Sequence, residues 1–221
     1  MIKSLILGAV FACATLPSTI NAGAIPPTAR IHGKSYAEWS AVWWQWAVSL
    51  PADQNPLFDQ GVSVNGANGQ TGRGWFLTGV INESGTAERS LTIPAGTMLF
   101  FPIINTECST LEPDPFHGDN EQELRECAAQ FTLGNLVADI DGVAVPDLEQ
   151  FTAMSPMFQF TAPANNVLGV DPGTGFSVAN GVYLMLAPLS VGEHTIHFGG
   201  TYIDANFTLD ITYHITVVPG R

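Results

Sequence analysis

Charged residues are scarce in this sequence, and basic residues are the scarcest. Only 12% of the 221 residues are Asp, Glu, Lys or Arg, about half the share usual in a soluble domain. Lys and Arg number 7 against 20 Asp and Glu. Proteins that bind nucleic acids or anionic membranes need clusters of Lys and Arg. The composition therefore argues against nucleic acid as a partner and favours metal cations or neutral glycans.

Long uncharged apolar runs are absent after residue 24, so we expect no transmembrane segment in the mature chain. Residues 1–24 have the pattern of a signal peptide. A short positive start ends at Lys3, residues 4–16 are mostly apolar but too few to span a bilayer, and Ala22 and Ala24 offer a small-x-small cleavage pattern. The alternative is a retained membrane anchor. We expect a periplasmic or extracellular protein with 6 basic and 20 acidic residues, a net charge of −14.

Cysteine is also rare. Cys13 leaves with the predicted signal peptide, so Cys108 and Cys127 are the only thiols of the mature chain. A pair of cysteines in an oxidising compartment predicts a disulfide. The alternative, a metal site with two thiolate ligands, is disfavoured because neither cysteine belongs to a Cys-x-x-Cys motif.

Hydrophobic residues, in contrast, make up 46% of the chain and aromatic residues 10%. A chain of this composition can bury a full core, which excludes intrinsic disorder. No internal repeat and no linker divides the sequence. We expect one β-rich domain over residues 25–221, in which residues 25–60 form a leading helix and loop.

A helix is predicted over residues 35–49. Ser35 and Glu38 have the spacing of a capping box, and Pro51 ends the helix. An aromatic stripe follows one side of this helix, and Trp44 lies apart from it; the stripe consists of Tyr36, Trp39, Trp43, Trp46 and Leu50. The stripe either packs on a sheet or forms an exposed platform on which sugar rings stack. Trp44, Trp39 and Trp75 are the ligand-binding candidates.

The rest of the chain is typical of a Greek-key β-sandwich, immunoglobulin-like or jelly-roll. Strands are predicted at 74–81, 89–93, 97–104, 136–140, 158–161, 182–187, 193–198 and 207–218. The run Leu99-Phe100-Phe101 predicts a central strand that is covered on both faces. Residues 51–73 are predicted to form a long surface loop. The stretch Leu189-x-x-Gly192-x-His194 resembles the corner of immunoglobulin-like domains, with His194 where those domains have Tyr.

One segment, residues 107–126, is strongly acidic. It contains Glu107, Glu112, Asp114, Asp119, Glu121, Glu123 and Glu126. Asp119 is predicted to cap a short helix with the buried stripe Leu124, Cys127, Ala128 and Phe131. Glu112, Asp114, Asp119 and Glu121 are candidate Ca²⁺ ligands, although their spacing does not match an EF-hand. The same segment could supply two catalytic carboxylates, as glycoside hydrolases require, or form a plain solvated face.

Motifs of other catalytic classes are missing. The sequence has no Gly-x-Ser-x-Gly and no His-Glu-x-x-His. His194 and His197 have a metal-like spacing only on a helix, because residues three apart on a strand point to opposite faces.

Several stretches together resemble a family of secreted bacterial proteins with no assigned activity. They are Gly33 to Trp39, Trp43-Trp44-Gln45-Trp46, Asn55 to Asp59, Trp75 to Gly79, Pro94 to Asn105, Leu186 to Leu189 and Gly192 to Gly200. The resemblance implies an envelope or extracellular setting and transfers no catalytic residue. Some relatives carry an extra Cys pair near the Gly74-Trp75-Phe76-Leu77 strand, which this sequence lacks.

The leading hypothesis from sequence is a non-catalytic binding module for a glycan, a cell-envelope component or another neutral or cationic ligand. The alternative is a secreted hydrolase or lyase that acts on an extracellular polymer through the carboxylates of residues 107–126. No cofactor is indicated other than Ca²⁺.

Overall fold

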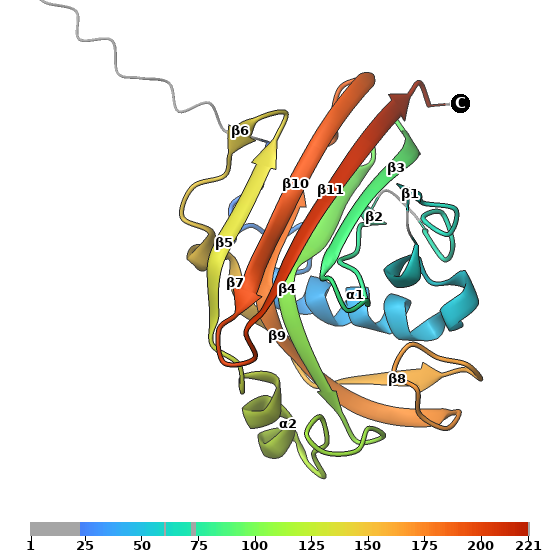
Figure 1. Cartoon of the computed structure of the whole chain (residues 1–221), viewed down its shortest axis with the longest axis vertical. Helices are drawn as coiled ribbons and strands as arrows, with labels where there is room; N and C mark the ends of the chain where they lie inside the picture. The colour runs from blue at the N-terminus through green and yellow to red at the C-terminus, as the bar shows by residue number, and fades with distance from the viewer. Residues whose placement is uncertain (1–22, 60, 72–73, 221) are drawn as a thin grey trace, which may run out of the picture.

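Two β-sheets and one aromatic helix make up most of the structure, a computed structural model that describes residues 23–59, 61–71 and 74–220 (Figure 1). The signal peptide predicted for residues 1–24 lies outside the described residues except for its last two positions. The sheets share one hydrophobic core. The structure confirms a mainly β sandwich with a Trp-rich helix. No helix of the described residues is long and apolar enough to cross a bilayer.

The six-stranded sheet has the order β1-β3-β11-β10-β5-β6. Its strands are β1 (Gly61–Val62), β3 (Thr86–Pro94), β11 (Phe207–Val218), β10 (Gly192–Tyr202), β5 (Leu133–Ile140) and β6 (Val143–Ala144). The pairs β1–β3 and β3–β11 are parallel and the others antiparallel, so the sheet is mixed. In β11 the alternating residues Ile211, Tyr213 and Ile215 are buried, as the sequence pattern predicts.

The second sheet has the order β2-β4-β9-β7, and β8 also pairs with β9. Its strands are β2 (Gly74–Phe76), β4 (Met98–Ser109), β9 (Gly173–Leu186), β7 (Thr152–Met154) and β8 (Phe158–Ala162). Strand β4 is buried on both faces, which confirms the prediction of a central strand. Phe100 contacts Tyr36 of the helix at a ring distance of 6.0 Å, whereas Phe101 contacts Phe198 of the other sheet at 4.7 Å.

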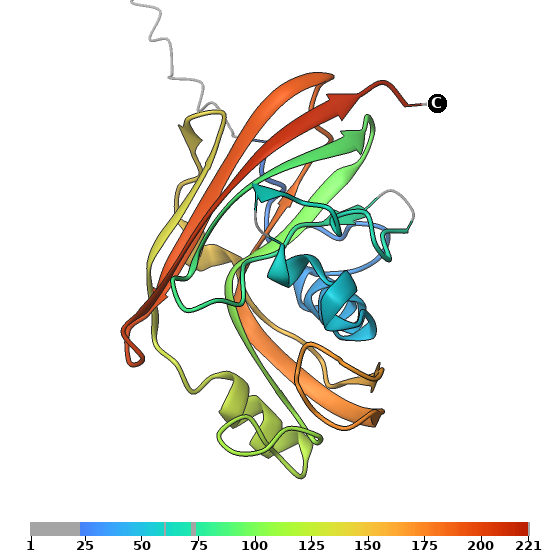
Figure 2. The ribbon, with the colours of Figure 1, turned by 45° about the vertical axis from the view of Figure 1, so that its right-hand side comes forward.

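Helix α1 (Tyr36–Ser49) packs on the second sheet, opposite the six-stranded sheet (Figure 2). The predicted capping box between Ser35 and Glu38 is present. Trp43 is 1% exposed, and its indole Nε1 donates a hydrogen bond to the Leu77 carbonyl at 2.9 Å. Trp46 is also buried and packs on Phe76. The aromatic stripe is therefore part of the core.

The short acidic helix differs from its predicted limits. Helix α2 (Glu121–Ala128) has Asn120 as its N-cap, and the Asn120 side chain accepts from the Glu123 backbone N–H. Asp119 does not cap the helix because its carboxylate contacts His117 instead, at 3.1 Å. Phe131 follows the end of the helix and is not part of its buried stripe.

Three further segments contain more regular structure than the sequence indicates. The predicted loop at 51–73 includes the 3-10 helices Ala52–Gln54 and Pro56–Phe58 as well as β1. A further 3-10 helix, Leu148–Phe151, precedes β7. Strand β9 begins at Gly173, nine residues before the predicted strand at 182–187. The early part of β9 contains Gly and Ser, which carry little strand signal, and its pairing with β8 and β4 compensates.

A buried arginine connects the six-stranded sheet to the segments that precede it. Arg89 of β3 is 1% exposed, and its guanidinium lies over the Tyr213 ring at 5.5 Å. It donates hydrogen bonds to the carbonyls of Asp59, Thr78 and Gly79 and to the Tyr213 hydroxyl. These uncharged acceptors replace part of the water that a buried charge loses, and they bond Nε and Nη1 while Nη2 is buried without a partner. In the sequence Arg89 is a single charged residue within a strand pattern, and nothing in that pattern indicates that it is buried.

We predict that the buried and the exposed faces of α1 differ in their contribution to stability. Trp43→Ala should lower the free energy of unfolding by about 3–5 kcal/mol, because it removes a fully buried ring and leaves a cavity. Trp44→Ala should cost clearly less, because Trp44 is only half-buried. Urea titration followed by circular dichroism measures both. Equal losses at the two positions would contradict this assignment.

Candidate functional site

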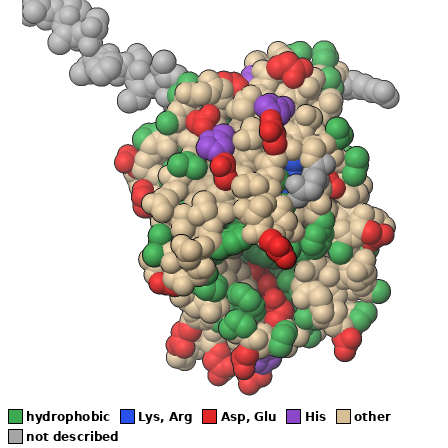
Figure 3. Space-filling view, viewed as in Figure 1, with side chains coloured by type: hydrophobic (Ala, Val, Ile, Leu, Met, Phe, Trp, Pro, Cys, Tyr) green, Lys and Arg blue, Asp and Glu red, His purple; other side chains and the backbone are tan. Residues whose placement is uncertain are grey.

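A cleft of about 500 Å³ opens where the two sheets diverge below their shared core. It lies between α1, the middle of β4 and the turn that joins β10 to β11. Figure 3 shows this hollow in the lower half of the molecule, with hydrophobic side chains around it and acidic side chains inside. The residues that line it are Trp44, Ile81, Asn105, Thr106, Glu107, Glu112, Phe116, Phe131, Val167, Leu168, Tyr202, Ala205 and Phe207.

Glu107 of β4 is the buried acid of the cleft. It is 5% exposed, and its carboxyl accepts a short hydrogen bond from the Ser177 hydroxyl of the neighbouring strand β9. Burial raises the pKa of Glu107 well above its usual range, and the charge of Glu112 raises it further, against the opposing effect of Ser177. Glu107 is therefore held in its neutral, protonated form to a higher pH than an exposed glutamate.

Glu112 lies in the loop after β4 and faces Glu107. The Ser109 hydroxyl donates to Glu112 Oε2 at 2.8 Å. Burial raises the pKa of Glu112, while hydrogen bonds with Glu107 and Ser109 and the charge of His117 act in the opposite direction. The hydrogen bond between the two carboxyls raises the pKa of Glu107 and lowers that of Glu112. Each carboxyl thus affects the protonation of the other, and burial favours the neutral form of both.

His117 supports the loop that carries Glu112. Its Nδ1 is 2.8 Å from the Glu112 carbonyl oxygen, and its Nε2 is 3.1 Å from Asp119 Oδ1. The hydrogen bonds with Asp119 and with the Glu112 carbonyl raise the pKa of His117. The imidazole therefore gains positive charge near an acidic loop, which reduces the repulsion among its carboxylates.

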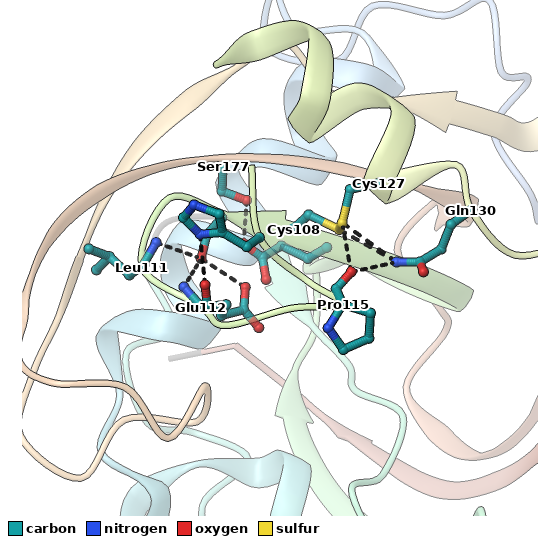
Figure 4. Close-up of a disulfide and its surroundings, with 10 residues drawn as sticks. Cys108, Leu111, Glu112, Pro115, Cys127, Gln130 and Ser177 are labelled. Atoms are coloured by element: carbon teal, nitrogen blue, oxygen red, sulfur yellow. Dashed lines mark hydrogen bonds between the residues drawn. A yellow bond between two sulfur atoms is a disulfide. The ribbon is translucent and has the colours of Figure 1, made fainter. Parts of the chain in front are cut away.

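The predicted disulfide is present and holds this side of the cleft together. Cys108 of β4 is bonded to Cys127 of α2 (Figure 4). Gln130 Nε2 donates to the Pro115 carbonyl at 3.2 Å, and the Ser109 backbone N–H donates to the Phe116 carbonyl. The loop between β4 and α2 is therefore tied to both elements. These ties position Phe116 and Glu112 at the cleft.

Aromatic rings from distant parts of the chain form the opposite wall. Phe131 meets Tyr202 edge-on at a ring distance of 5.4 Å, and Tyr202 packs on Phe207. The Tyr202 hydroxyl donates a short hydrogen bond to the Asn105 carbonyl. Burial raises the pKa of Tyr202 to about 12, so its hydroxyl is a neutral donor. This bond joins the end of the β10–β11 hairpin to β4.

The structure places the three tryptophan candidates for ligand binding in different surroundings. Trp44 lines the cleft and packs edge-on against Trp43 at a ring distance of 5.0 Å. Trp39 is half-buried against Phe100, and its Nε1 donates to the Ile31 carbonyl. Trp75 is half-buried on β2. Neither Trp39 nor Trp75 lines the cleft.

The four predicted Ca²⁺ ligands do not converge. Glu112 faces Glu107 in the cleft, and Asp114 is exposed. Asp119 contacts His117, and Glu121 pairs with Arg125 at 2.6 Å. Within the described part of the chain, no group of three or more His, Cys, Asp or Glu side chains has the arrangement of a metal site.

Several residues of the cleft carry no signal in the sequence. Tyr202 and Phe207 are ordinary strand aromatics, and Leu168 lies in a loop. The sequence pattern predicts Phe131 on the buried stripe of the short acidic helix instead of in a cleft. Only the density of acids at residues 107–126 indicated this part of the site, because local patterns do not report contacts between distant segments.

Comparisons with known proteins do not place the chain in a family. No family model and no curated protein matches it. Among solved structures it is similar to a chain in the structure of PbICP-C in complex with falcipain-2, with a TM-score of 0.28 and 8% identity over 66% of this chain and 100% of that chain. A likeness this weak supports no statement about fold or function.

We predict that Glu107 makes stability depend on pH. Because folding raises its pKa above the ordinary 4.5, the folded state binds this proton more tightly than the unfolded chain. Stability must then fall as pH rises from 4.5 through the folded pKa. Glu107→Gln should lessen this decline and raise the stability at pH 7 by about 1 kcal/mol, roughly 2–4 °C in Tm.

Thermal melts between pH 4 and pH 8 measure this effect. Glu126→Gln is the matched control, since Glu126 is exposed on α2 and should leave the pH profile unchanged. A Glu107→Gln profile that follows the wild-type profile would contradict the protonated state of Glu107.

Proposed function

We propose that the chain is a ligand-binding protein whose cleft takes a small organic molecule with an apolar body and a cationic group. The observation that carries this proposal is the combination of an aromatic and aliphatic wall with two carboxyls inside one cleft. Pockets of several hundred Å³ with few, placed polar groups are typical of small-molecule sites.

The charge of the cleft supports a cation. Among the described residues that line it there is no Lys or Arg, and two of them, Glu107 and Glu112, are acidic. An anionic ligand would meet these carboxyls without a compensating positive charge. An ammonium group would instead donate a charge-assisted hydrogen bond to the Glu112 carboxylate.

The walls support an apolar body more than a glycan. A sugar ring needs hydrogen-bond partners around its edge as well as an aromatic face. Here the polar side chains are Asn105, Thr106 and the two glutamates, and the remaining lining is aliphatic or aromatic, with the Tyr202 hydroxyl already bonded to the Asn105 carbonyl. A glycan stacked on Trp44 is the weaker form of the proposal.

Hydrolysis is the second candidate function, and the presence of two carboxyls with pKa values raised by burial, Glu107 and Glu112, favours it. One neutral and one ionised carboxyl are the acid and base that acid–base catalysis requires. Glycoside hydrolases, however, keep their two carboxyls about 5 Å or more apart to place the substrate between them. Glu107 and Glu112 instead face each other closely enough for each to shift the pKa of the other. This arrangement suits ligand capture better, or a water-activating pair of the aspartic-protease kind.

We also propose that the protein is exported, as the secreted family it resembles would be. The signal-peptide pattern of residues 1–24 supports this, and so does the disulfide, because disulfides persist in oxidising compartments. A ligand from the periplasm or from outside the cell would then meet the cleft directly.

The experiment compares benzylamine with benzyl alcohol, benzoate and N-acetylglucosamine by isothermal titration calorimetry at pH 7.5. We expect the amine to bind most tightly and benzoate not to bind. Glu112→Gln should weaken benzylamine binding about 10- to 100-fold, since a charge-assisted hydrogen bond contributes about 1.5–3 kcal/mol. Benzyl alcohol binding should change little in this variant.

Glu126→Gln again serves as the control, because it removes one acidic charge from an exposed residue that does not line the cleft. Equal effects of Glu112→Gln and Glu126→Gln on benzylamine would show that only the overall charge matters. Tighter binding of N-acetylglucosamine than of benzylamine would replace the cationic ligand by a glycan.

A further inference from the structure

A second, smaller space continues the cleft into the protein. This inner pocket has a volume of about 150 Å³ and is more enclosed than the cleft. Both spaces are lined by the same five residues: Trp44, Ile81, Asn105, Tyr202 and Phe207. Because they share these walls, one ligand can occupy both.

The inner pocket is apolar where the cleft is acidic. The side chains that line it beyond the shared residues include Trp43, Leu57, Val80, Ile103, Ile104 and Leu209. They come from α1, the segments after α1 and β2, and one strand of each sheet. A space with such a lining stays dry and favours hydrocarbon over water.

An irregularity in β4 forms one wall of this pocket. The register of β4 against β9 shifts between Pro102 and Ile104, so Ile103 is the extra residue of a β-bulge. Three consecutive residues of one strand, Pro102 to Ile104, therefore line the same pocket, although a regular strand would turn the middle one away. The shape of this wall is thus set by the backbone of β4 as well as by its side chains.

We propose that the ligand is an amphiphilic primary amine, whose ammonium group lies against Glu107 and Glu112 and whose unbranched hydrocarbon chain extends into the inner pocket. This inference rests on the proposed function and adds the class of the ligand. The acidic cleft matches the ammonium group of such a molecule, and the apolar inner pocket matches its hydrocarbon chain.

The test uses n-alkylamines from butylamine to decylamine, with the n-alcohols of equal length as matched probes, by isothermal titration calorimetry at pH 7.5. Each methylene that enters the inner pocket should tighten amine binding roughly fourfold. The gain should stop at the length that fills the pocket. The alcohols should show the same dependence on chain length at weaker affinity.

Gly79→Leu fills the inner pocket and tests its role. A Cβ at Gly79 would meet Leu209 Cδ1 at 3.8 Å, an ordinary contact, so the first atom of the new side chain displaces no neighbour. This variant should bind butylamine as the wild type does and lose the gain for longer chains. Gly74→Leu, on β2 outside both spaces, should keep the gain.

Leu209→Ala gives an independent readout, because it enlarges the pocket instead of filling it. The optimal chain should become longer by one or more methylenes. If amines bind without any dependence on chain length, the inner-pocket assignment is overturned and the proposed function stands. If no amine binds at any length, both are overturned.

Discussion

Strand β4 is covered on both faces, and the rest of the structure depends on this constraint. Phe100 packs toward the aromatic helix α1 and Phe101 toward Phe198 of the opposite sheet. A strand buried twice must be apolar at consecutive positions, which explains the continuous hydrophobic run in its sequence. The helix α1, the sheet that contains β4 and the six-stranded sheet form three layers, and the two outer layers are positioned by their contacts with the middle one.

The cleft exists because β4 continues beyond the region where the sheets face each other. Figure 2 shows β4 and β9 curving away from β10 and β11 toward α2. The Cys108–Cys127 bond fastens α2 to this extension of β4. The end of the β10–β11 hairpin crosses the gap, where the Tyr202 hydroxyl reaches the Asn105 carbonyl. The site is therefore formed by elements that are already held in place, which reduces the ordering cost of binding.

The buried pair Glu107 and Glu112 destabilises the folded state, so good packing of the core does not explain its presence. Placing Glu107 in a nearly inaccessible position beside Glu112 forces it to keep a proton that an exposed glutamate would release. Ser177 and Ser109 offset part of this cost through hydrogen bonds. Buried ionisable groups with perturbed pKa values in a cleft are characteristic of functional sites. Arg89, whose hydrogen bonds go to carbonyls and hydroxyls within the core, shows the opposite case of a buried charge with a structural role.

Local patterns in the sequence determined the elements of this protein. The capping box at Ser35 fixed the start of α1, the alternation over residues 207–218 fixed the buried face of the last strand, and the single cysteine pair fixed the disulfide. The tertiary structure alone decided the cleft, because Trp44 and Phe207 meet across more than half of the chain. It also decided the state of Glu107, since a pKa depends on burial and on neighbouring charges. Periodicity records which side of an element is apolar, but it carries no information about which distant side chains that element will face.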